Sequence, residues 1–151
     1  MKEAIANAGV FNLMTVFIII LLAFFVGSLS YSKAFKVKNN IVDEIEKDQG
    51  YETATQDNIE KWLGQIGYRV NNDNGWKCPD ATEAGGERIN NTSNYQYCVY
   101  RFDTCSKGSD KAKCGTYYRV IAYMYFDVPI INDLIKIPVM GETVTFNEIN
   151  S

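Results

Sequence analysis

The feature that most constrains this chain is an uncharged apolar stretch near its N-terminus. Residues 8–29 contain no charged side chain, and segment 13–26 reads LMTVFIIILLAFFV, in which Thr15 is the only polar residue. As an α-helix the stretch measures about 30 Å, which is enough to cross the hydrocarbon core of a bilayer. A helix is required there, because lipid offers backbone amides no hydrogen-bond partner. We therefore predict that residues 1–30 form a single transmembrane anchor.

Two other interpretations of this stretch are open. One is a cleaved signal peptide, because Ser28 and Ser30 have the size and spacing of a cleavage site, and cleavage after Ser30 would release a secreted domain. The other is the core helix of a soluble protein. The basic region expected before a signal sequence is reduced to Lys2, which Glu3 offsets, and the helical pattern continues past Ser30. We therefore favour an anchor that is not cleaved there.

The orientation of the anchor is predicted from the cysteines. Only one lysine precedes the apolar stretch, and three follow it closely: Lys33, Lys36 and Lys38. The positive-inside rule alone would therefore place the C-terminal part in the cytoplasm. All four cysteines lie beyond the anchor, and an even set in a small domain is typical of disulfides formed outside the cytoplasm. We give the cysteines more weight and predict a cell-membrane protein with an extracytoplasmic, disulfide-containing head at residues 51–151.

Four cysteines allow three disulfide connectivities. We favour a local clamp between Cys105 and Cys114, with Cys78 and Cys98 tying a long loop to a strand. A zinc site is the alternative, but the chain has no C-x-x-C motif and no histidine.

The pattern beyond the anchor predicts that the same helix continues out of the membrane. No glycine or proline occurs between Leu29 and Gly50, and apolar residues recur on one side of residues 31–50. We predict one helix from Lys2 to Asp48, with Gly50 as the residue that stops it. Its amphipathic part covers the sheet of the head and could also contact other subunits through an assembly face, made of Phe35, Val42 and Ile45.

A second helix is predicted to begin at a Thr55 cap and to end at Gly67. Its buried face comprises Ile59, Trp62, Leu63 and Ile66. A strand could start at residues 68–70, and residues 71–93 are rich in Asn, Gly, Asp and Thr, which is typical of a loop.

Alternating β-branched and aromatic residues predict an antiparallel sheet in the rest of the head. Residues 95–102 and 117–126 form a hairpin with a basic loop, and residues 135–137 and 143–146 form two short strands joined around Gly141. Pro138 indicates a sheet edge. The fold class is therefore α+β, with a single transmembrane helix that continues into an amphipathic helix packed on a small antiparallel sheet.

The tyrosines of the hairpin and the lysines of its loop form a candidate binding surface. Its members are Tyr95, Tyr97, Tyr117, Tyr123, Tyr125, Lys107, Lys111 and Lys113. The alternative is that these tyrosines are half-buried packing residues whose hydroxyls reach water.

Composition excludes several classes of function. The absence of histidine removes histidine-based catalysis and histidine metal ligands, and a net charge of −3 argues against a nucleic-acid partner. Acidic residues near the predicted strand ends are scattered and form no convergent catalytic set: Asp103, Asp127, Asp133 and Glu142. We predict no catalytic residues, no metal, no cofactor and no enzymatic activity. Two overlapping N-x-[ST] sequons leave glycosylation open at Asn90 and Asn91.

Two parts of the sequence share their plan with a known family. The first is Gly9, which the apolar run and the long helix follow. The second is the C-terminal end, where an aromatic strand leads through a proline and an apolar turn to two short strands: Tyr123, Tyr125, Pro129, 135–139 and 144–146. In this plan the chain resembles the TadE-like proteins, which are minor pilin or pseudopilin-like components of tight-adherence pilus systems. Pilin-like proteins carry a glutamate just inside the apolar segment, and residues 10–15 contain none, so processing after Gly9 stays open.

The resemblance implies a pilin-like fold and a non-enzymatic structural or assembly role in a bacterial surface or secretion apparatus. The expected partners are the lipid bilayer and protein subunits, either further copies of the chain or other pilus or secretion components. Two alternatives are open. One is a membrane-tethered extracellular binding module that uses the tyrosine-rich hairpin, and the other is a secreted domain released near Ser30.

Overall fold

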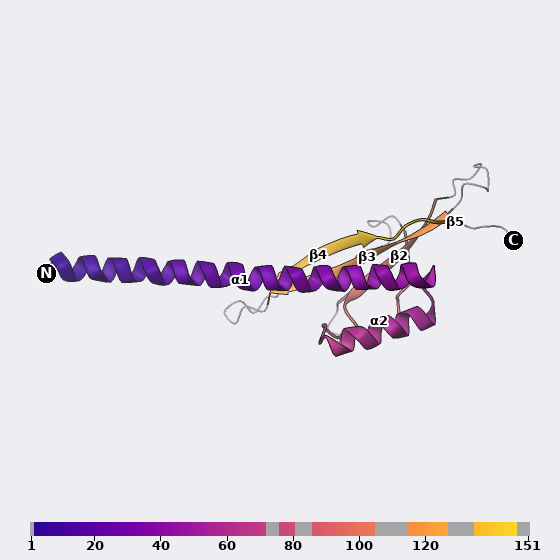
Figure 1. The fold of residues 1–151 in the computed structure, drawn as a ribbon, viewed down its shortest axis with the longest axis horizontal. Coiled ribbons are helices and arrows are strands. Elements are labelled where there is room, and N and C mark those ends of the chain that lie inside the picture. The colour runs from indigo at the N-terminus through magenta and orange to yellow at the C-terminus, as the bar shows by residue number, and fades with distance from the viewer. Residues whose placement is uncertain (1, 72–75, 81–85, 105–114, 127–134, 148–151) are drawn as a thin grey trace.

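The computed structural model describes residues 2–71, 76–80, 86–104, 115–126 and 135–147, with the backbone alone for residues 2–8, 126 and 135. Its main element is α1 (Lys2–Asp48), one unbroken helix. In Figure 1 the N-terminal half of α1 extends as a rod beyond the rest of the molecule, while its C-terminal half crosses the sheet beside α2 (Thr53–Gln65). The prediction of one helix from Lys2 to Asp48 is confirmed.

The end of α1 is a Schellman motif. Gln49 adopts the left-handed conformation with φ 55°, and its N–H donates to the carbonyl oxygen of Glu46 at 3.2 Å. The N–H of Gly50 donates to the carbonyl oxygen of Ile45 at 3.1 Å, which completes the motif. The prediction of Gly50 as the residue that ends the helix is therefore one position late, because Gln49 makes the turn.

The boundaries of α2 follow the sequence at its C-terminal end only. Gly67 takes φ 62° directly after the C-cap Ile66, which confirms it as the terminating residue. The N-cap is Glu52 and not Thr55 as predicted, but Thr55 does help to cap the helix, because its hydroxyl accepts the Glu52 N–H at 3.5 Å in a capping box. Thr55 lies inside the first turn, and its buried hydroxyl donates to Asp48 Oδ2 at 2.8 Å, so it ties α2 to the end of α1.

The sheet is antiparallel throughout and confirms the α+β class. Its strand order is β1 (Glu87–Arg88), β2 (Tyr97–Asp103), β3 (Gly115–Phe126) and β4 (Ile135–Glu142), and β5 (Phe146–Asn147) pairs with the first residues of β3. The β2–β3 pair is the predicted hairpin. Val70 and Tyr95 form an isolated bridge where the sequence suggested a strand start.

The predicted division of the C-terminal strands is wrong. β4 continues from Ile135 to Glu142 through both Pro138 and Gly141, and Gly141 pairs with Val120 instead of forming a turn. The side chain of Lys38 on α1 packs closely over this glycine, since a Cβ there would lie 2.2 Å from Lys38 Cδ and would displace the lysine stem. Pro138 is tolerated since β4 is the outer strand beyond β3, as the sequence predicted.

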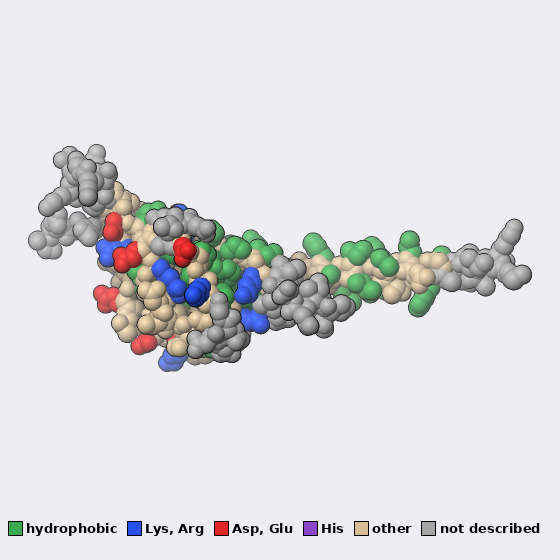
Figure 2. Space-filling model, turned by 180° about the vertical axis from the view of Figure 1, so that it is seen from behind, with side chains coloured by type: hydrophobic (Ala, Val, Ile, Leu, Met, Phe, Trp, Pro, Cys, Tyr) green, Lys and Arg blue, Asp and Glu red, His purple; other side chains and the backbone are tan. Residues whose placement is uncertain are grey.

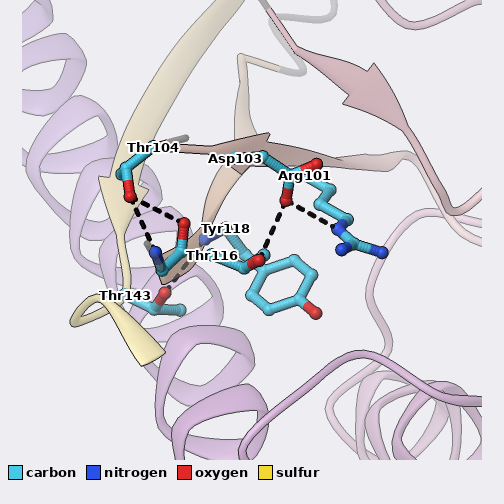
Figure 3. Close-up of polar contacts among 7 residues, drawn as sticks. Arg101, Asp103, Thr104, Thr116, Tyr118 and Thr143 are labelled. Carbon is cyan, nitrogen blue, oxygen red and sulfur yellow. Dashed lines mark hydrogen bonds and ion pairs between the residues drawn. The ribbon is translucent and has the colours of Figure 1, made fainter. Parts of the chain in front are cut away.

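Polar contacts fix the end of the sheet that lies farthest from the rod (Figure 3). The hydroxyl of Thr104 donates to the carbonyl oxygen of Gly115 at 2.8 Å and accepts the Gly115 N–H at 2.9 Å. Asp103 Oδ1 accepts from the Thr116 hydroxyl at 2.9 Å. The β2–β3 pair is therefore held together as far as the last described residue on each side of its loop.

The main core lies between the two helices and one face of the sheet. The helices contribute Val37, Ile41, Ile45, Ile59 and Leu63, and the strands contribute Tyr97, Val99, Tyr118, Val120 and Ala122. The second half of α1 is therefore part of the head's own core. A smaller cluster covers the opposite face of the sheet, where segment 76–80 packs on β2 and β3 through Trp76 and Cys78.

Candidate functional site

The N-terminal half of α1 is an apolar rod whose large side chains stay exposed among the residues that the structure describes. Its large apolar side chains from Val10 to Leu29 are 45% to 76% exposed. The few polar groups are satisfied within the helix, since the Thr15 hydroxyl donates to the Phe11 carbonyl at 2.9 Å and the Ser28 hydroxyl to the Phe24 carbonyl at 3.0 Å. By length and composition this helix is able to cross a membrane.

Where the rod meets the head, the described residues cover α1 on one side. Ala34 and Val37 are buried against the sheet side, at 2% and 0% exposure. Tyr31 and Phe35 stay exposed and stack on each other with ring centroids 6.3 Å apart. The ammonium of Lys38 lies 4.4 Å from the centre of the Phe35 ring. An aromatic surface therefore continues from the apolar rod onto the level of the head.

The predicted assembly face is divided by the structure. Ile45 is completely buried in the main core, and Val42 is half-buried beside it, whereas Phe35 is 43% exposed. Phe35 and Ile45 are ten residues apart in the helix. Their side chains therefore point in directions about 80° apart around the helix axis. Ile45 cannot reach another subunit while the head is folded, so the exposed part of the predicted face is Phe35, together with its neighbour Tyr31.

A cavity of about 360 Å³, which we call the junction cavity, lies where the rod joins the head. Its described lining comes from residues 30, 33 and 34 of α1, residues 67–69 after α2, and Tyr123 and Tyr125 of β3. The ammonium of Lys33 donates to the carbonyl oxygen of Gly67 at 3.3 Å. The guanidinium of Arg69 lies 4.9 Å from the centre of the Tyr125 ring. Three segments far apart in the sequence therefore bring two cations to one cavity.

The tyrosine hydroxyls around this cavity are engaged inside the head. The Tyr68 hydroxyl accepts the Tyr123 N–H at 2.9 Å, and the Tyr125 hydroxyl donates to Gln96 Oε1. Burial raises the pKa of Tyr68 to about 12 and also raises the pKa of Tyr125. Both hydroxyls are therefore neutral near pH 7, and the charge of the described lining comes from Lys33 and Arg69.

The prediction of a single tyrosine surface is wrong. The register pairs Tyr97 with Ala122 on the helix-facing side of the sheet, and Tyr97 is completely buried. Its hydroxyl lies 2.9 Å from that of Tyr51, and burial raises the pKa of Tyr97 to about 12. Tyr95 also packs against the main core. Strand alternation places the remaining predicted tyrosines on the opposite face: Tyr117, Tyr123 and Tyr125.

On that opposite face the tyrosines pack against aromatic and cationic neighbours. Tyr117 stacks on Phe102 with ring centroids 4.9 Å apart, and Tyr123 meets Trp76 edge-on at 5.8 Å. The predicted lysines of the surface and the predicted Cys105–Cys114 disulfide lie outside the described residues: Cys105, Lys107, Lys111, Lys113 and Cys114.

The predicted Cys78–Cys98 disulfide is confirmed, and it holds segment 76–80 against the sheet. Close to it, the side-chain amide of Asn90 hydrogen-bonds to the backbone of β2 just beyond the end of β1. Its Nδ2 donates to the Tyr97 carbonyl oxygen at 2.7 Å, and its Oδ1 accepts the Val99 N–H at 2.9 Å. Asn90 is completely buried and Asn91 is exposed, so of the two sequon asparagines only Asn91 presents its amide to solvent.

No protein-family model, curated protein or solved structure matches the chain. Within the described ranges, His, Cys, Asp and Glu side chains form no group of three or more that could hold a metal ion. The features that bear on function are therefore the apolar rod, the exposed aromatic pair Tyr31 and Phe35, and the junction cavity.

Proposed function

We propose that the protein is a non-enzymatic, single-pass membrane protein with an extracytoplasmic head, acting as a pilin-like structural or assembly subunit of a bacterial surface or secretion apparatus. The observation that carries this proposal is the continuity of α1. One helix is an apolar rod over its first half and the central core element of the head over its second half.

The exposed rod requires a nonaqueous environment. Fifteen large apolar side chains between Val10 and Leu29 are about half exposed or more. Burying each of them would contribute roughly 1.5 kcal/mol, or on the order of 20 kcal/mol together. This exceeds the about 5–15 kcal/mol by which a typical domain is stable. Lipid, or the helices of other subunits within lipid, would provide this burial.

The rigid join between rod and head favours an assembly subunit over a tethered receptor. α1 contains no glycine or proline from Ser30 to Asp48, and Ala34 and Val37 are already packed against the head. The head is thus fixed to the rod without a linker. Tyr31 and Phe35 extend the apolar surface of the rod to the level of the head, where a neighbouring helix could pack. The alternative binding module is weakened because Tyr97 is buried.

Anchoring is tested on the full chain expressed in bacteria. Membranes are washed with alkaline carbonate, intact cells or spheroplasts are treated with protease, and intact mass is recorded with and without reductant. We expect retention in the membrane, a head accessible from outside, and no cleavage near Ser30. A mature form that begins near Tyr31 and is found in the medium would contradict the anchor.

Assembly is tested by photo-cross-linking from position 17 in the rod, with Phe17 replaced by benzoylphenylalanine. We expect cross-linked multimers in membranes, and we expect Tyr31→Ser with Phe35→Ser to reduce their yield severalfold. The matched control is Met140→Ser with Val144→Ser, since both side chains are similarly exposed but belong to β4 and the segment after it. Monomers only, or equal losses in both double variants, would refute the assembly role.

A further inference from the structure

We propose that the end of β4 nearest the rod lies in the headgroup layer of the bilayer, where Ile137 contacts lipid and gives the head a second membrane contact beside the anchor. The inference rests on the proposed membrane anchor, because the anchor determines the depth of every residue in the head.

The packing of β4 against α1 sets the level of each strand residue. β4 begins at the rod end of the head and runs along α1 (Figure 1). Val139 is buried in one cluster with Ala34, and the side chain of Lys38 packs over Gly141. Two residues of the strand therefore advance as far as four residues of the helix, which is about 6 Å by either count.

This relation places Ile137 within the headgroup layer. Two residues before Val139, Ile137 lies level with Ser30, one residue beyond Leu29. With Leu29 at the edge of the hydrocarbon, Ile137 lies about 1.5 Å outside that edge. The polar layer on each side of a bilayer is about 5–8 Å thick. Ile137 is therefore inside this layer, whereas Met140, about 10 Å farther along the strand, lies beyond it.

The side chain of Ile137 is available to lipid. Strand alternation places it on the helix-facing side of the sheet with Val139, and its partner in register is Met124. Val139 and Met124 are buried, whereas Ile137 is 41% exposed. The described core on this side of the sheet thus ends before Ile137, and the apolar surface of the strand continues toward the rod.

The backbone beside Ile137 also suits a layer that is poor in water. The Tyr123 N–H donates to the Tyr68 hydroxyl at 2.9 Å, and this hydroxyl lies 3.2 Å from the carbonyl oxygen of Gln96, next to β2. The backbone of Tyr123 therefore faces β2. Its partner in register is Pro138, whose backbone thus points to the open edge of the sheet. Another residue there would present an N–H without a strand partner, which is costly near lipid, but proline has no N–H.

Cations flank this end of the head. Lys136 is exposed, and strand alternation points it to the opposite face of β4 from Ile137. Figure 2 shows Lys and Arg side chains gathered where the head meets the apolar helix, while most acidic side chains on that face lie toward the other end. A lysine at the edge of the hydrocarbon extends its ammonium to the phosphates while its stem contacts apolar groups. The distribution of charge therefore favours the same end of the head as the membrane contact.

The test uses the full chain in nanodiscs of phosphatidylglycerol and phosphatidylcholine, with benzoylphenylalanine at position 137. After irradiation, intact-mass analysis should show an adduct with the mass of one phospholipid. The matched controls carry the same photoreactive residue in place of Met140 or Val144, which are 58% and 60% exposed but lie farther from the rod. Their lipid adducts should be severalfold weaker. Near-UV circular dichroism checks that each variant is folded.

A smaller probe gives a second measurement. Ile137→Trp and Met140→Trp are compared for quenching by a phospholipid that carries a nitroxide on its headgroup, with the fluorescence of the unsubstituted chain as background. We expect severalfold stronger quenching of the added tryptophan at position 137.

Equal lipid contact at positions 137 and 140 would overturn the proposal. Cross-linking from position 137 to a second copy of the chain instead of to lipid would also overturn it, because this end of β4 would then be an interface between subunits. A chain that stays in the membrane and forms multimers but shows no lipid contact at position 137 refutes this inference while leaving the proposed function intact. Loss of the chain from the membrane refutes both.

Discussion

Replacing Asn90 with alanine should destabilise the head strongly, although Asn90 lies in a turn-rich loop segment and carries no charge. Its amide acts in place of a strand residue at the edge of β2. The Ile89 N–H donates to the Val99 carbonyl at 3.0 Å. The side chain of Asn90 continues this ladder: its Oδ1 accepts the Val99 N–H at 2.9 Å, and its Nδ2 donates to the Tyr97 carbonyl at 2.7 Å. Asn90→Ala removes both partners at once.

The magnitude follows from the two backbone groups left behind. Tyr97, Val99 and Asn90 are all completely buried. Each buried donor or acceptor that loses its partner costs about 1–3 kcal/mol, so the variant should lose about 2–6 kcal/mol. Asn90→Asp should be at least as costly, because it keeps the acceptor for Val99 but places an oxygen opposite the Tyr97 carbonyl. Asn91→Ala is the matched control. It is exposed and should change stability by no more than about 0.5 kcal/mol.

The assay is urea unfolding of the full chain in detergent micelles, followed by the fluorescence of Trp62 and Trp76, which pack against the two core clusters. The difference in unfolding free energy between the variants at residues 90 and 91 is the quantity of interest. If Asn90→Ala shifts the transition as little as Asn91→Ala, the amide does not close the strand edge and the reasoning is refuted.

Three further predictions concern the two core clusters of the head. Ile41→Ala should cost about 2–5 kcal/mol in urea unfolding, since Ile41 is completely buried between α1 and the sheet. Replacing both Cys78 and Cys98 with serine should cost about 3 kcal/mol, the chain entropy of a loop closed over a separation of 20 residues, as measured by thermal or urea unfolding. Burial raises the pKa values of Tyr68 and Tyr97 from 10.0 to about 12, so the folded head retains protons that the unfolded chain releases. The contribution of these two tyrosines to stability should therefore be constant well below pH 10 and fall by roughly 2 kcal/mol per tyrosine as the pH rises to 12, as measured by urea unfolding at each pH.

The parts of the fold that the sequence predicted are those set by local pattern. The absence of glycine and proline between Leu29 and Gly50 predicts the unbroken α1, and alternation predicts the β2–β3 hairpin. Gly67 ends α2 as predicted, because its left-handed conformation strongly favours glycine. The Cys78–Cys98 pairing was one of three possible connectivities, and the choice depended on assigning residue 78 to a loop and residue 98 to a strand.

The errors arise where tertiary contacts override a local signal. Gly141 resembles a turn residue but belongs to a strand, because β4 stays paired with β3 through Val120, and the stem of Lys38 packs over the glycine. Thr55 belongs to the capping box of α2 as its third residue and not as its N-cap, and its hydroxyl also hydrogen-bonds to Asp48 at the end of α1. Arg69 carries no sequence signal as a site residue, because only the return of the chain after α2 places it beside Lys33.

The predicted assembly face is only partly exposed, since Ile45 is buried, Val42 is half-buried and Phe35 is exposed. This division has a physical reason that bears on assembly. A helix with the head on one side must bury a narrow stripe, which here is Ala34, Val37, Ile41 and Ile45. Among the residues that the structure describes, Phe35 and Tyr31 lie outside that stripe and stay exposed, so they add little to the described core of the head. Because α1 runs without a break from the rod into the core, the packing of Ala34 and Val37 fixes the direction in which those two rings point. The folding of the head thus determines which face of the rod a neighbouring subunit would meet, and substitutions at the junction should affect assembly even when they leave anchoring unchanged.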